Sequence, residues 1–137
     1  MERSSQISRS SIKKPIFIVH RFDDYGNKVD RVLTTFLRRL GFDILEGSGY
    51  EAIDNPDKIA EKIISQDIFI CLVTPGDTLW ILTETVYARA IKKYIIILCQ
   101  ENIDFKSGIL GSDYEYISFP ENNLEKCFND LLYALPS

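Results

Sequence analysis

The residues of this sequence whose types and spacing could best serve a chemical reaction are Trp80 and Glu84. Glu84 is the only acidic residue in the stretch from Leu79 to Ile91, LWILTETVYARAI, and most of its neighbours are apolar. If that stretch is a helix, Trp80 lies one turn before Glu84 on the same face. A carboxylate on a largely buried helix costs free energy unless a partner or a reaction uses it. We therefore predict that Glu84 has a functional role; the structural alternative is a buried ion pair with an arginine such as Arg21 or Arg89.

A second polar segment, His20-Arg-Phe-Asp-Asp24, follows the apolar run PIFIV, and a third, residues 46–54, contains two glycines and ends in Asp54. His20, Arg21 and Phe22 are candidates for substrate binding, as is Asp54. Each also has an ordinary structural interpretation, namely a backbone contact, a solvated turn with a helix cap, or local packing. His20 is the only histidine, so it is the single candidate base for Ser-His or Cys-His catalysis.

The elements that must position these residues alternate between short apolar runs and helical patterns. Strands are predicted at 15–19, 42–45, 67–73 and 94–99, with a weaker edge strand at 114–119. Helices are predicted at 24–40, from the Asn55-Pro56 cap onward, at 79–91 and at 124–135. Strands that alternate with helices need crossover connections, which predicts a parallel sheet with helices on both faces.

The predicted fold is therefore a three-layer α/β domain with a five-stranded parallel sheet. Strand order 2-1-3-4-5, as in flavodoxin-like proteins, is the common solution at this size. In such sheets ligands bind beyond the carboxyl ends of the strands, where the strand order reverses. Three segments should meet there, namely His20–Asp24, the loop 46–54 and the turn 74–78. The turn leads to Trp80 and Glu84.

Composition narrows the function further. The chain has 137 residues, of which 45% are hydrophobic, so we expect one domain at 15–137 that follows a flexible polar tail at 1–14. The formal net charge of -4 predicts that the protein does not bind nucleic acid. No apolar run is long enough to span a membrane. Cys71, Cys99 and Cys127 lack disulfide or zinc-site spacing, which predicts reduced thiols, a cytoplasmic protein and no metal.

Taken together, these segments resemble a TIR domain of the bacterial TIR-like kind over roughly residues 15–135. PIFIVHRFDD is similar to the family's first strand and polar loop, DIFICLVTP to its third strand, and Tyr94–Leu98 to its fourth. The loop 46–54 stands where the family has its mobile BB loop. TLWILTE, residues 78–84, matches the family's W-x-x-x-E pattern in the helix after the third strand.

The resemblance implies cleavage of the nicotinamide–ribose bond of NAD, with Glu84 as the catalytic carboxylate and no cofactor besides this substrate. Trp80 would line the pocket, Phe22 would stack on nicotinamide, and Arg21 would contact the pyrophosphate. It further implies self-association through TIR–TIR contacts, a possible sensor or effector partner, and a role in anti-phage or immune-type signalling. The product is left open among linear, cyclic and conjugated ADP-ribose.

Two other functions remain open at this point. The chain could be a non-catalytic TIR adaptor that acts through assembly, with an incomplete pocket. It could instead resemble the nucleoside 2-deoxyribosyltransferases, which have a related fold and also place a glutamate at an oxocarbenium-like centre. A response-regulator interpretation is disfavoured, because the third strand ends in Thr74-Pro75 without a phosphoacceptor aspartate.

Overall fold

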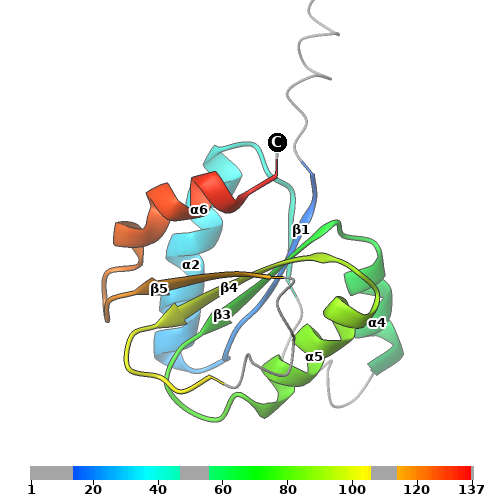
Figure 1. The fold of residues 1–137 in the computed structure, drawn as a ribbon, viewed down its shortest axis with the longest axis horizontal. Helices are drawn as coiled ribbons and strands as arrows, with labels where there is room; N and C mark the ends of the chain where they lie inside the picture. Colours follow the sequence, from blue (N-terminus) through cyan, green and yellow to red (C-terminus); the bar gives the residue numbers. More distant parts are fainter. Residues whose placement is uncertain (1–13, 47–55, 106–113, 137) are drawn as a thin grey trace, which may run out of the picture.

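The computed structural model describes residues 14–46, 56–105 and 114–136 and, for 56–59, the backbone alone. Its centre is a parallel sheet of five strands in the order β2-β1-β3-β4-β5, as the alternation of elements predicted (Figure 1). The strands are β1 (Ile16–Val19), β2 (Ile44–Glu46), β3 (Ile68–Val73), β4 (Tyr94–Gln100) and β5 (Glu115–Phe119). The helices are α2 (Asp24–Arg39), α4 (Pro56–Ile64), α5 (Leu79–Ala90), the 3₁₀ turn η2 (Leu124–Cys127) and α6 (Phe128–Ala134).

Helices cover both faces of the sheet, which makes three layers (Figure 1). Ile16 and Ile18 point to the face covered by α2, η2 and α6, which we call the α2 face. Phe17 and Val19 point to the face covered by α4 and α5, which we call the α5 face. Because side chains alternate along a strand, this division also fixes the direction of the residues that follow β1.

Two elements differ clearly from the sequence predictions. The second strand begins at Ile44, not at residue 42, because the Phe42 N–H bonds back to the Leu37 carbonyl and closes α2. Gly41, at φ 95°, allows this reversal, as expected of a residue that ends a helix. The last predicted helix, 124–135, is instead a 3₁₀ turn followed by the short helix α6.

The three cysteines are free and buried, in agreement with the predicted reduced thiols. None of the helices in the described parts of the chain combines the length and the apolar character that a membrane crossing requires.

Candidate active site

Glu84 lies on α5, and the residue is only 7% exposed. Its carboxylate is close enough to β3 to act on Cys71, whose pKa is raised to about 12 by burial first, with the nearby charges of Cys99 and Glu84 adding to the shift. Trp80 lies one helical turn away on the same helix. At the start of the helix, the Leu79 N–H donates to the Asp77 carboxylate at 3.0 Å.

A row of three aromatic rings crosses from the end of β1 to the start of α5. The rings of His20 and Phe22 have centroids 4.4 Å apart, and those of Phe22 and Trp80 stack at 5.7 Å with 24° between their planes. Both connecting segments leave the carboxyl ends of their strands, where a parallel sheet is expected to bind its ligand. The structure therefore brings Phe22 beside Trp80, as the sequence predicted.

Arg21 holds the two connecting loops together. Its Nε lies 3.1 Å from an oxygen of Asp23, and its Nη1 donates to the Asp77 carbonyl across the sheet edge. The same guanidinium lies so close to Gly76 that a Cβ there would be 2.4 Å from Arg21 Cζ. A positively charged group is thereby fixed between the loops after β1 and β3.

Asp23 begins α2 as its cap, with the Gly26 N–H donating to its carboxylate at 2.7 Å. Partial burial works to raise the pKa of Asp23, but this hydrogen bond and the Arg21 charge outweigh it, and the pKa is lowered. This agrees with the helix-cap interpretation of the segment His20–Asp24.

His20 turns toward the α2 face and meets two acids there. Its Nδ1 lies 3.5 Å from Oδ1 of Asp30, on α2, and 3.8 Å from Oε1 of Glu46, at the end of β2. On the other edge of the ring, Nε2–H donates to the Asn27 side-chain oxygen at 3.2 Å. The three acidic and basic side chains come from three different segments, and neither Asp30 nor Glu46 was predicted to be a site residue.

Burial controls the protonation of this cluster, which we call the His20 cluster (His20, Asp30, Glu46). It lowers the pKa of His20, against the opposing effect of the Glu46 charge, so the imidazole is neutral near pH 7. Burial is also the largest of the causes that together raise the pKa of Asp30 to about 9, followed by hydrogen bonding to Glu46 and the charge of that carboxylate. The site thus disfavours the charged form of both His20 and Asp30.

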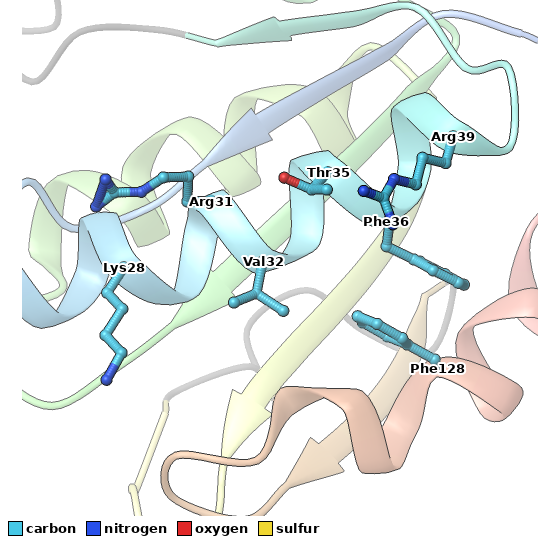
Figure 2. Close-up of a pocket in the computed structure, with 7 residues that line it drawn as sticks. All are labelled: Lys28, Arg31, Val32, Thr35, Phe36, Arg39 and Phe128. Carbon is cyan, nitrogen blue, oxygen red and sulfur yellow. The ribbon is translucent and has the colours of Figure 1, made fainter.

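A groove of about 480 Å³ lies elsewhere, on the outer side of α2 (Figure 2). The rings of Phe36 and Phe128 stack in it at 3.8 Å, and the cationic side chains of Lys28, Arg31 and Arg39 also line it. Its lining holds no carboxylate and none of the predicted site residues. The chemistry expected of Glu84 therefore does not belong to this groove.

The structure brings three of the predicted site residues, His20, Phe22 and Trp80, into one row of ring contacts at the sheet edge, whereas Arg21 contacts Asp23 and Asp77. Glu84 lies one helical turn after Trp80 on α5. The fifth predicted binding residue, Asp54, lies outside the described residues. One signal could have found Asp30, because it precedes Leu33 by three residues and Leu37 by seven and so falls on the apolar side of its helix.

Comparison with known proteins supports the fold. A scan of family models and a search of curated proteins each found no match to the sequence. Among solved structures, the chain is similar to a Clostridium botulinum CMP N-glycosidase, BcmB, with 21% identity, a TM-score of 0.63, and coverage of 86% of this chain and 98% of that one. It is also similar to the Vibrio vulnificus NanR protein complexed with ManNAc-6P, with 15% identity, a TM-score of 0.58, and coverage of 96% and 53%.

Proposed function

We propose that this protein cleaves the N-glycosidic bond between the base and the ribose of a nucleotide, with Glu84 as the catalytic carboxylate and NAD as the substrate. The observation that carries the proposal is the position of Glu84. It is a buried acid on the helix that leaves the carboxyl end of β3, one turn from a tryptophan that stacks on Phe22.

A single carboxylate is sufficient for this reaction when the leaving group is nicotinamide. Ordinary glycosides need a general acid to protonate the departing oxygen, as well as a second carboxylate. In NAD the base is already a pyridinium cation. When the C1′–N bond breaks, the electron pair moves to the ring nitrogen and nicotinamide departs neutral. Water then adds to C1′ and loses one proton to solvent.

Glu84 would act on the charge that develops during this step. The positive charge on the ribose is greatest in the oxocarbenium-like transition state, and a fixed carboxylate attracts it most strongly where water is excluded. Trp80 and Phe22 offer aromatic faces to the base, and the Arg21 guanidinium offers hydrogen bonds to a phosphate. The tight packing of Arg21 between two loops would hold that charge in place.

A second candidate substrate is a nucleoside monophosphate such as CMP. The similarity in fold to a CMP N-glycosidase favours it. A cytosine leaving group is neutral in the substrate and departs less readily than nicotinamide. CMP cleavage would therefore need a proton donor in addition to Glu84, whereas NAD cleavage would not.

The test is to incubate the full chain with NAD, with CMP and with a deoxyriboside plus a free base, and to follow the released base by chromatography. Each reaction is run with dilute protein and again with concentrated protein under crowding, because TIR-like enzymes are expected to need self-association. Release of nicotinamide that is lost in Glu84→Gln, and kept in the exposed control Glu61→Gln, supports the proposal. Release of cytosine alone would favour the second candidate. Exchange of the base between deoxyribosides would favour the transferase, and no reaction under any condition would favour the non-catalytic adaptor.

A further inference from the structure

The His20 cluster contains three acceptor atoms that face one another without a positive group between them. Nδ1 of His20, one oxygen of Asp30 and one oxygen of Glu46 all lie within 4.8 Å of one another. Each of these atoms is buried and has no hydrogen-bond partner among the residues that the structure describes. The side chains of His20 and Asp30 are only 4% and 9% exposed, so bulk water does not solvate them.

The contact with Asn27 determines which ring nitrogen of His20 carries the hydrogen and which one faces the two acids. The amide oxygen of Asn27 can only accept a hydrogen bond, so Nε2 carries the ring hydrogen. In a neutral imidazole the other nitrogen, Nδ1, then has a free lone pair. Nδ1 and the two carboxyl oxygens therefore face one another in a region of low dielectric, where either a shared proton or a bound cation must offset their repulsion.

We propose that His20, Asp30 and Glu46 form a binding site for a divalent transition-metal ion, with Nδ1 and one oxygen from each carboxylate as its ligands. Metal-binding histidines typically donate their other N–H to an oxygen, and Asn27 fills that role here. Tetrahedral ligands at 2.0–2.1 Å from zinc are about 3.4 Å apart. The distances of 3.5 and 3.8 Å from Nδ1 to the two acids need little contraction to reach that spacing.

The ligand set also indicates the class of metal. Calcium and magnesium prefer sites built wholly of oxygen, whereas an imidazole with two carboxylates suits zinc or manganese. Such an ion would tie together the end of β1, the first half of α2 and the end of β2. It would lie on the α2 face, opposite Glu84, so this inference does not depend on the proposed reaction.

The expectation of no metal came from cysteine spacing, which says nothing about ligands that three separate elements contribute.

The test uses the full chain after treatment with a chelator, titrated separately with Zn²⁺, Mn²⁺, Mg²⁺ and Ca²⁺ while binding heat and the thermal midpoint are recorded. We expect one equivalent of Zn²⁺ or Mn²⁺ to bind and raise the midpoint, with Mg²⁺ and Ca²⁺ at least about tenfold weaker. Because the chain has one histidine, the imidazole nitrogen signals in an NMR spectrum all belong to His20, and Zn²⁺ should shift Nδ1.

Two variants and a control locate the site. Glu46→Gln keeps the shape of a partly exposed side chain but removes a ligand, and it should weaken binding at least tenfold. Asn27→Ala should weaken it roughly 10- to 100-fold, as loss of a group that orients a metal ligand does. Asp43→Asn alters an exposed acid three residues before Glu46 and should bind like the unmodified chain.

Three results would overturn the inference. If neither Zn²⁺ nor Mn²⁺ binds to the unmodified chain, the cluster holds protons only. If Glu46→Gln, shown to be folded by circular dichroism, binds as tightly as Asp43→Asn, the ion binds elsewhere. If Mg²⁺ or Ca²⁺ binds as well as Zn²⁺, the nitrogen ligand is not used.

Discussion

The carboxyl edge of the sheet carries buried acids on both faces, and the two regions are built differently. On the α5 face, Glu84 and Trp80 belong to one helix, and their relation follows from helical spacing. On the α2 face, His20, Asp30 and Glu46 come from three elements and meet only when β1, α2 and β2 pack together. Phe22 joins the two regions, because its ring contacts His20 on one side and Trp80 on the other.

This difference shows that the role of a buried carboxylate depends on the groups that surround it. The α5 region offers an acid and aromatic faces, which suits a reaction whose leaving group needs no proton. The α2 region offers several acceptors at short range, which suits the binding of a cation. Neighbouring buried acids can thus have separate roles, and matched substitutions can separate them.

The largest expected effect separates the two acids by activity. Glu84→Gln removes a charge stabiliser and should lower kcat/KM for NAD by about 10²–10³. The same change at Glu46 removes a carboxylate from the opposite face of the sheet, and we expect it to cost far less turnover. Steady-state nicotinamide release measures both, and equal losses in the two variants would mean that the two regions form a single site.

The next effect concerns the contact between the loops after β1 and β3. Gly76 has φ +124°, a backbone conformation that residues with a Cβ rarely adopt, and it packs on Arg21. Gly76→Ala should lower the free energy of unfolding by roughly 1–3 kcal/mol. Urea denaturation followed by the fluorescence of Trp80, the only tryptophan, measures this.

The double variant Arg21→Ala/Gly76→Ala divides that loss into two parts. The clash with the guanidinium disappears in the Arg21→Ala background, while the backbone strain stays. A loss of equal size in both backgrounds would show that Arg21 and Gly76 are not coupled.

The smallest effect concerns the ring that joins the regions. Phe22→Leu keeps an apolar side chain but removes both aromatic contacts, and it should cost about 0.5–1.5 kcal/mol of stability. The emission of Trp80 should change at the same time, because its stacked partner is lost. Tyr133→Leu, at a residue 84% exposed, is the control and should stay within about 0.5 kcal/mol. An unchanged emission in Phe22→Leu would contradict the stack.

Much of the fold could be predicted because the signals are local. β3 and β4 are almost wholly apolar runs, as strands covered on both faces must be, and α2 has the spacing of a helix with one buried side. The start of β2 could not be predicted in the same way. Phe42 has the character of a strand residue, but its N–H is used to close the preceding helix, and only the three-dimensional path of the chain decides between the two.

The candidate site shows the same limit more sharply. The proximity of Trp80 and Glu84 could be predicted from the sequence because both residues belong to one helix, one turn apart. Glu46 was treated as the first residue of a loop, and nothing in its neighbours indicates that it aligns with Ile18 in the sheet and so faces His20. Asp30 had a signal in its helical position, but its partners lie 10 and 16 residues away in other elements.

The reactivity of two buried cysteines, Cys71 and Cys127, can report local opening of the fold. Burial raises the pKa of Cys71 to about 12, and it raises the pKa of Cys127 to about 11, so neither thiol reacts readily with an alkylating reagent while the fold is closed. Cys71 lies in the core of the α5 face, and Cys127 lies in the core of the α2 face. The alkylation rate of each thiol, resolved by mass spectrometry, therefore reports how often its own side of the sheet opens.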